Sequence, residues 1–306
     1  MIDLGSMVER VMEALSQRGL DAFEVYATSS SGFTVEVKDG KVDVFSKHEN
    51  AGLSVRVLKE QQPGFAYSTD LSPEKVPQLV EQVVHGAGAS DPDAFLGFPG
   101  PVSDPSPKLD QFDESLQAVA LEEKIDRARE LESVARASDP RIKKVRKAAY
   151  AENADKVTIC NHNGIQLAAS KTLVSGSIMV VAEEGGDAES GWDYGFSPFF
   201  DELEIDRIGR TAAARAVSLL GARPIRSMRV PALFPPWVAS DVLSVLSDSF
   251  MADNLQKGKS MLVGQKGKHA FSPHVTVVDD GLYPGGIGSS PFDDEGSFHE
   301  LSLIHI

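Results

Sequence analysis

Cysteine is nearly absent from this sequence. Among 306 residues there is one, Cys160, so no disulfide can form within the chain, and small scaffolds held together by disulfides are excluded. No stretch approaches eighteen uninterrupted apolar residues, and the amino end carries Asp3 and Glu9 without a basic flank before an apolar core. The sequence therefore predicts neither a membrane-spanning helix nor an export signal, and its cysteine usage fits the reducing cytoplasm.

Positive charge is also scarce. Lys and Arg number 30 against 45 Asp and Glu, which gives a net charge of −15. Nucleic-acid affinity depends on clustered Lys and Arg, and the one basic cluster, Arg141–Lys147, leads into an expected strand where a solvated surface is favoured. Composition thus argues against a nucleic-acid binder. The length and the 42% hydrophobic content support two or three globular domains, each with its own core.

Hydrophobic periodicity predicts an α+β fold. Apolar residues from Val8 to Leu15 recur at helical spacing and stop at Gly19, as expected for an amphipathic helix. Alternating residues on both sides of Asp39-Gly40 predict a hairpin. Ser72 is expected to cap a helix that begins at Pro73 and runs to about residue 86. The first domain, residues 1–90, is therefore an α/β unit with an antiparallel sheet.

Proline marks the next boundary. Residues 91–113 contain five prolines and few apolar residues, which indicates a semi-rigid linker. An α+β middle domain is expected at 114–222, and a β-rich carboxyl-terminal domain at 227–300. No internal repeat is visible. The expected middle-domain elements are a helix at 114–137, strands at 144–152, 156–161 and 166–183, a glycine-rich loop at 185–197 and a helix at 205–220. The last domain is expected to contain strands at 229–234 and 275–278.

The sequence contains no pattern typical of a metal site or an activated nucleophile. None of its seven histidines stands four residues from another on an expected helix. Asp293, Asp294 and Glu295 follow a glycine-rich loop, and their oxygens are ligands that a divalent cation prefers. Because EF-hand spacing and a histidine pair are missing, a polar turn that faces a partner or a substrate groove is favoured. We therefore assign no catalytic, cofactor-binding or metal-binding residue to the chain.

Three separated segments carry a family resemblance. They are Ala51–Val57 with Gly64–Leu71, then Asp155–Ile159 with Asn163-Gly164, and finally the stretch from Gly258-Lys259-Ser260 to Glu295-Gly296. In their order and spacing these segments resemble the three domains of the TldD/PmbA family, the two-subunit bacterial peptidases that are also described as modulators of DNA gyrase. The resemblance covers nearly the whole chain.

The resemblance implies a zinc site in the catalytic subunit of that family. Its HExxxH motif lies on a helix, where imidazoles bind the metal and the glutamate handles the proton of a bound water. Alignment on Trp237 and Lys257-Gly258 gives this chain Leu243 and Asp248 at the metal positions and Ser244 at the glutamate. Leucine cannot bind zinc, and serine cannot replace a carboxylate base without a separate activator.

The resemblance therefore implies a PmbA/TldE-type, non-catalytic subunit of a cytoplasmic metallopeptidase. A TldD-like partner would hold the zinc, and this chain would hold no cofactor. Unfolded or extended peptides, including peptide precursors that mature by proteolysis, are the expected substrates. Two other hypotheses stay open: a self-sufficient hydrolase that uses Asp293, Asp294 and Glu295, and a regulatory module that binds a partner such as gyrase without proteolysis.

The last six residues, Leu301–Ile306, depart from the family pattern. Their sequence, LSLIHI, equals the in-frame translation of a transposon-based sequencing adapter, whereas family members continue past this point. We expect residues 301–306 to be non-native and the carboxyl-terminal domain to be incomplete.

Overall fold

A computed structural model describes residues 4–101, 108–269, 271–299 and the backbone of 301–302. The chain forms two compact units. The first comprises Met1–Ala222 with Tyr283–His299, and the second comprises Arg223–Leu282 with Glu300–Ile306.

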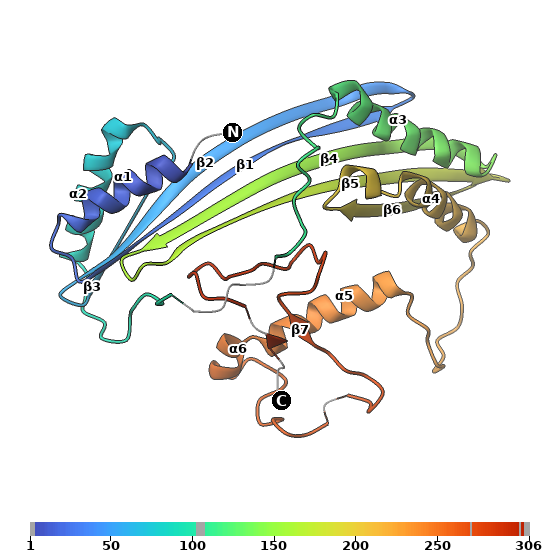
Figure 1. Cartoon of the computed structure of the whole chain (residues 1–306). Coiled ribbons are helices and arrows are strands. Elements are labelled where there is room, and N and C mark those ends of the chain that lie inside the picture. The colour runs from blue at the N-terminus through green and yellow to red at the C-terminus, as the bar shows by residue number, and fades with distance from the viewer. Residues whose placement is uncertain (1–3, 102–107, 270, 300, 303–306) are drawn as a thin grey trace. The chain divides into compact units, whose positions relative to one another are not determined.

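One six-stranded antiparallel sheet runs through the first unit (Figure 1), in the order β3-β2-β1-β4-β5-β6. The predicted hairpin is confirmed, because β1 and β2 are joined at Asp39 and Gly40, with φ of 52° and 72°. The expected first and middle domains therefore share a single sheet. The strands are β1 (Ala22–Lys38), β2 (Lys41–Lys59), β3 (Gln62–Ser68), β4 (Ile142–Asn161), β5 (Gln166–Glu184) and β6 (Asp187–Ser197).

Four helices cover one face of this sheet, which we call the helical face. Figure 1 shows α1 (Leu4–Ser16) and α2 (Val76–Ala87) at one end, and α3 (Leu121–Ser138) and α4 (Ile205–Leu219) at the other. On β1, Val25 belongs to the core under α1 and α2, whereas Val35 belongs to the core under α3 and α4. The two residues are an even number of positions apart, so they point to the same face.

The opposite face, which we call the loop face, carries a smaller apolar cluster. Ile159, Ile165 and Phe292 are buried there. Phe292 belongs to the segment Tyr283–His299, which returns to the sheet more than eighty residues after β6. This segment therefore lies on the loop face, and its apolar anchor is Phe292.

The prediction of a loop at 185–197 is wrong, because Asp187–Ser197 forms strand β6. Its glycines allow α4 to approach closely: a Cβ on Gly191 would lie 2.3 Å from the carbonyl oxygen of Ala212, and one on Gly195 would lie 2.8 Å from Ile208 Cδ1. The aromatic residues that alternate with these glycines, Trp192, Tyr194 and Phe196, therefore point to the opposite, loop face. The glycines that suggested a loop thus mark close packing of a helix on a strand.

Smaller corrections concern element ends. The helix expected from residue 114 begins at Leu121, and the two strands expected at 144–152 and 156–161 are one continuous strand, β4. Ser72 does not cap the following helix, since its hydroxyl donates to Asp70 Oδ1 at 2.6 Å. The helix that ends before Gly19 and the helix over Ile205–Leu219 are confirmed.

The second unit has little strand in its described part. It contains α5 (Pro236–Ser247), the 3-10 turn η3 (Asp248–Phe250), α6 (Ala252–Gln256) and β7 (Asp279–Asp280), which pairs with β8 (Leu301–Ser302). The prediction of strands at 229–234 and 275–278 is wrong, because neither stretch pairs with another strand among the described residues. A strand forms only where a neighbouring strand satisfies its backbone groups.

Candidate functional site

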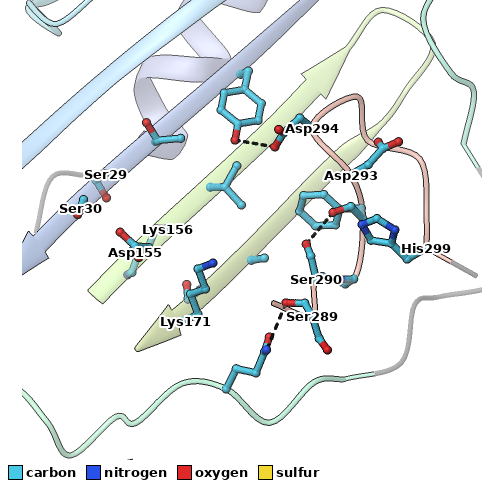
Figure 2. A pocket seen from close by; sticks show the side chains of 18 residues that line it. Ser29, Ser30, Asp155, Lys156, Lys171, Ser289, Ser290, Asp293, Asp294 and His299 are labelled. Atoms are coloured by element: carbon cyan, nitrogen blue, oxygen red, sulfur yellow. Dashed lines mark hydrogen bonds between the residues drawn. The ribbon is translucent and has the colours of Figure 1, made fainter. Parts of the chain in front are cut away.

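A groove of 610 Å³ lies on the loop face beneath the segment Tyr283–His299 (Figure 2). Its volume falls within the range of about 300–1,000 Å³ that is usual for ligand sites. Its floor belongs to three adjacent strands, because Thr28 on β1 pairs with Val157 on β4, which pairs with Ala169 on β5. Other lining residues are Ser30, Asp155 and Lys171 on the floor, and Ser289, Ser290, Asp293, Asp294 and His299 on the segment above it.

Gln111 holds the upper wall of the groove in place. Its Nε2 donates to the carbonyl oxygens of Gly286, at 2.5 Å, and of Ser289, at 3.2 Å. Gln111 is 6% exposed and belongs to the end of the proline-rich linker. The linker therefore contributes to the site as well as joining two parts of the chain.

The three consecutive acids face three different partners. Asp293 Oδ1 accepts hydrogen bonds from the backbone N–H groups of Glu295, at 2.9 Å, and Ser297, at 2.8 Å. Asp294 Oδ1 accepts one from the hydroxyl of Tyr26 at 3.2 Å, and Glu295 pairs with Arg56 at 3.0 Å. Among the residues that the structure describes, no group of three or more His, Cys, Asp and Glu is arranged to hold a metal ion.

Tyr26 stays protonated in this setting. Burial, together with the charge and the hydrogen bond of Asp294, raises the pKa of Tyr26 to about 12. Its hydroxyl is therefore a hydrogen-bond donor near neutral pH, and it connects the floor of the groove to the segment above.

A buried acid orients Arg56 at the neighbouring end of the sheet. Glu24 is 1% exposed, and its Oε1 accepts from Arg56 Nε at 3.0 Å and from Nη2 at 2.7 Å. Burial raises the pKa of Glu24, and the hydrogen bonds from Arg56 oppose that rise only in part. Nη1 of Arg56 points to Glu295 instead.

The positions aligned with the zinc motif lie in the second unit. Leu243, which is 46% exposed, and Ser244 are on α5, and Asp248 begins η3. From Pro236 to Phe250 the sequence has no His, Cys or Glu, and its carboxylates are Asp241 and Asp248. Two carboxylates alone fall short of the three protein ligands that a catalytic zinc usually has.

Several groove residues were not singled out from the sequence. Tyr26, Gln111 and Lys171 come from segments far apart in the chain, and only the sheet register and the returning segment bring them together. The acids at 293–295 were singled out, and the structure places Asp293 and Asp294 on the groove wall.

The fold is that of an α+β protein whose long antiparallel sheet carries paired helices on one face. Family models of the PmbA/TldA metallopeptidases match three stretches of the chain: domain 1 at residues 23–87, the central domain at 114–220 and the C-terminal domain at 227–300. The chain therefore belongs to the PmbA/TldD family.

Curated relatives include proteins named PmbA and proteins named TldD. Metalloprotease PmbA of Escherichia coli O157:H7 is 26% identical over 96% of this chain and 65% of its own length. A metalloprotease TldD homolog of Haemophilus influenzae is 27% identical over 96% of this chain and 63% of its own length. The chain thus spans slightly less than two thirds of these relatives.

Solved structures share the fold. A putative modulator of a DNA gyrase from Thermotoga maritima superposes with a TM-score of 0.84 at 22% identity, over 98% of this chain and 68% of its own. TldE from Thermococcus kodakarensis gives a TM-score of 0.85 at 19% identity, over 96% of this chain and 66% of its own. In the described ranges of the present chain, no helix has the length and apolar character needed to cross a membrane.

Proposed function

We propose that this chain is the non-catalytic, PmbA/TldE-type subunit of a metallopeptidase, and that a TldD-like partner supplies the zinc. The observation that supports this proposal is the composition of α5 and η3, where Leu243, Ser244 and Asp248 occupy the positions of the motif. Neither two zinc-binding imidazoles nor a glutamate base is available there.

The groove on the loop face supports a peptide-binding role. Its walls offer hydroxyl, carboxylate, ammonium and imidazole groups beside Val157 and Phe292, a mixture that suits the alternating amide and side-chain groups of an extended peptide. The site of action in this proposal is the cytoplasm, in keeping with the single cysteine.

The experiment combines the chain with an HExxxH-bearing family member from the same genome. Each protein alone and the mixture are assayed for zinc by elemental analysis and for cleavage of casein. We expect the isolated chain to retain no stoichiometric zinc and to cleave nothing, and the mixture to cleave casein. Changing the glutamate of the partner's motif to glutamine should abolish cleavage, whereas Ser244→Ala in this chain should leave it unchanged.

About one zinc per isolated chain, lost on chelation together with proteolysis, would instead establish the self-sufficient hydrolase. The gyrase alternative is favoured by the names of two similar structures, each called a putative modulator of DNA gyrase, and it predicts that the purified chain binds gyrase without any TldD-like protein. Binding of gyrase together with a failure to activate the zinc subunit would replace the proposed function.

A further inference from the structure

A second cavity, of 460 Å³, lies beside Arg56 at the β3 end of the sheet. Most of its walls are apolar: Phe65 on β3 is 61% exposed, and Leu96 in the proline-rich stretch is 49% exposed. The charged groups on its walls are Arg56 and Glu295. We call this cavity the Arg56 pocket. Its remaining walls are Val57, Leu58, Pro63, Gly64, Gly86, Ser90, Gly97 and Phe98.

The guanidinium of Arg56 is held in one orientation from two sides. The Glu24 side chain is 2% exposed, and one of its carboxylate oxygens accepts hydrogen bonds from both Nε and Nη2 of Arg56. The ring of Phe98 lies 5.2 Å from the guanidinium carbon, in a cation–π contact. Because these contacts fix the plane of the group, Nη1 points in a set direction at the pocket wall.

The group that occupies Nη1 is poorly shielded from water. The Glu295 side chain is 63% exposed, in contrast to the buried Glu24, although both carboxylates pair with the same arginine. Exposed ion pairs contribute only about 0–1 kcal/mol to stability. Another carboxylate can therefore replace Glu295 at Nη1 at little cost, while Glu24 keeps the arginine in place.

We propose that the Arg56 pocket binds the free carboxyl end of a peptide whose last side chain is apolar. Arg56 binds the terminal carboxylate in the place of Glu295, and Phe65, Leu96 and Phe98 surround the last side chain. The identification of the ligand as a peptide rests on the proposed function. The chemistry follows from the pocket itself, which combines apolar walls with one oriented guanidinium.

The first test measures binding of an N-acetylated pentapeptide that ends in Phe to the full chain by calorimetry. We expect its free acid to bind at least about tenfold more tightly than its C-terminal amide, since a charge-assisted pair is lost in the amide. A peptide that ends in Ser should also bind about tenfold less tightly. Equal affinity for acid and amide overturns the proposal. Binding of N-acetylphenylalanine as tight as that of the pentapeptide overturns the assignment to peptides.

The second test removes the internal competitor. Glu295→Gln should raise the affinity for the free-acid peptide about threefold to tenfold, because the incoming carboxylate no longer displaces a charged group. The affinity for the amide should not change. Glu81→Gln on α2, which removes an exposed charge outside the pocket, is the matched control. A loss of affinity in Glu295→Gln would show that Glu295 contacts the ligand and would overturn the proposal.

The third test addresses the apolar walls. Phe65→Ala changes an exposed side chain and should weaken binding of the Phe-ending acid about fivefold, with little effect on the Ser-ending acid. An unchanged preference for Phe over Ser contradicts the proposal. These outcomes are independent of zinc and proteolysis: a chain that activates its zinc partner but does not distinguish acid from amide refutes the pocket alone.

Discussion

In the first half of the large sheet, α1 precedes three antiparallel strands and α2 follows them, and in the second half α3 and α4 occupy the same places (Figure 1). The halves meet where β1 pairs with β4. Each has a glycine under its second helix, Gly64 under α2 and Gly191 under α4. One helix–sheet–helix arrangement thus occurs twice, although no repeat is visible in the sequence.

The two helical-face cores differ in chemistry. The core under α1 and α2 consists of apolar residues such as Val11, Val55 and Val80. Beside the core under α3 and α4, Lys124 pairs with Glu152 at 2.8 Å, with side chains only 7% and 12% exposed. Tyr150 also donates to Glu152, at 2.8 Å. The first helix pair is therefore placed by apolar packing, whereas the second pair also depends on buried charges that accept few alternative geometries.

The largest expected effect tests the feature that both halves share. A Cβ on Gly64 would lie 2.3 Å from the carbonyl oxygen of Val83, and one on Gly191 would lie 2.3 Å from that of Ala212. Each Gly→Ala variant should lose about 3 kcal/mol or more of unfolding free energy in urea, because a backbone must move. Gly100→Ala, with open space around it, is the control. Tolerance at one site only would show that the two halves are not equivalent.

The next largest loss of stability is expected only in the second half of the sheet. Lys124→Met should destabilise the protein by about 3 kcal/mol, because Glu152 is left buried without its cation. The double variant Lys124→Met/Glu152→Gln should recover part of that loss. Lys144→Met is the matched control, since Lys144 pairs with Glu183 while 68% exposed, and it should change stability by less than about 0.5 kcal/mol. If both single variants behave alike, the buried pair does not place α3.

Two aspartates that occupy equivalent positions in the two halves of the sheet allow the halves to be compared through the pH dependence of stability. Asp113 precedes α3 and accepts from the N–H and hydroxyl of Ser115, at 2.9 and 2.6 Å, and from Phe200 N–H at 3.0 Å. Burial alone would raise the pKa of Asp113, but these hydrogen bonds together hold it below its usual value. Because the folded-state pKa is lowered, the stabilisation is present above about pH 4 and is lost as pH falls through the folded-state value.

Asp113→Asn should therefore be less stable than the parent by about 1–2 kcal/mol at pH 7, and the difference should shrink as the pH approaches 3. Asp70 makes the same contacts with Ser72 ahead of α2, but it lies at the surface. Asp70→Asn should give a smaller change in thermal unfolding over the same pH range. A pH-independent difference for Asp113→Asn would refute the charge-based account.

The sequence predicted elements with strong local periodicity. The α1 stripe ends before Gly19, and the β1–β2 hairpin turns at Asp39-Gly40, because both depend on nearby residues. Strand β6 was missed because Gly191 and Gly195 are required by α4, a contact that no local pattern reveals. The same periodicity predicted the α+β fold class, which the solved structures confirm.

The candidate site was predictable only in part. The acids at 293–295 were expected at a polar turn that faces a partner or a groove, and Asp293 and Asp294 do line one. Arg56 lies within a segment that carried the family resemblance, yet nothing local shows that Glu24 orients it or that Glu295, 239 residues away, pairs with it. Such contacts depend on strand register and on a returning segment, and neither is encoded in local spacing.

The smallest predicted changes in stability come from replacing one glycine in α2 and one in α4, and they are expected to have opposite signs. A Cβ on Gly86 in α2 would meet nothing within 4 Å, whereas a Cβ on Gly209 in α4 would lie 2.8 Å from Val134 Cγ1 on α3. Gly86→Ala should stabilise the protein by about 0.5–1 kcal/mol, since alanine lowers the entropy cost of helix formation. Gly209→Ala raises helix propensity by the same amount, but the added methyl group must push α3 away. A net loss of about 1 kcal/mol in unfolding free energy is therefore expected. Urea midpoints of the two variants provide the measurement. Stabilisation by Gly209→Ala as well would mean that α3 and α4 leave room for the added methyl group, and the proposed difference between the halves would then rest on the buried charges alone.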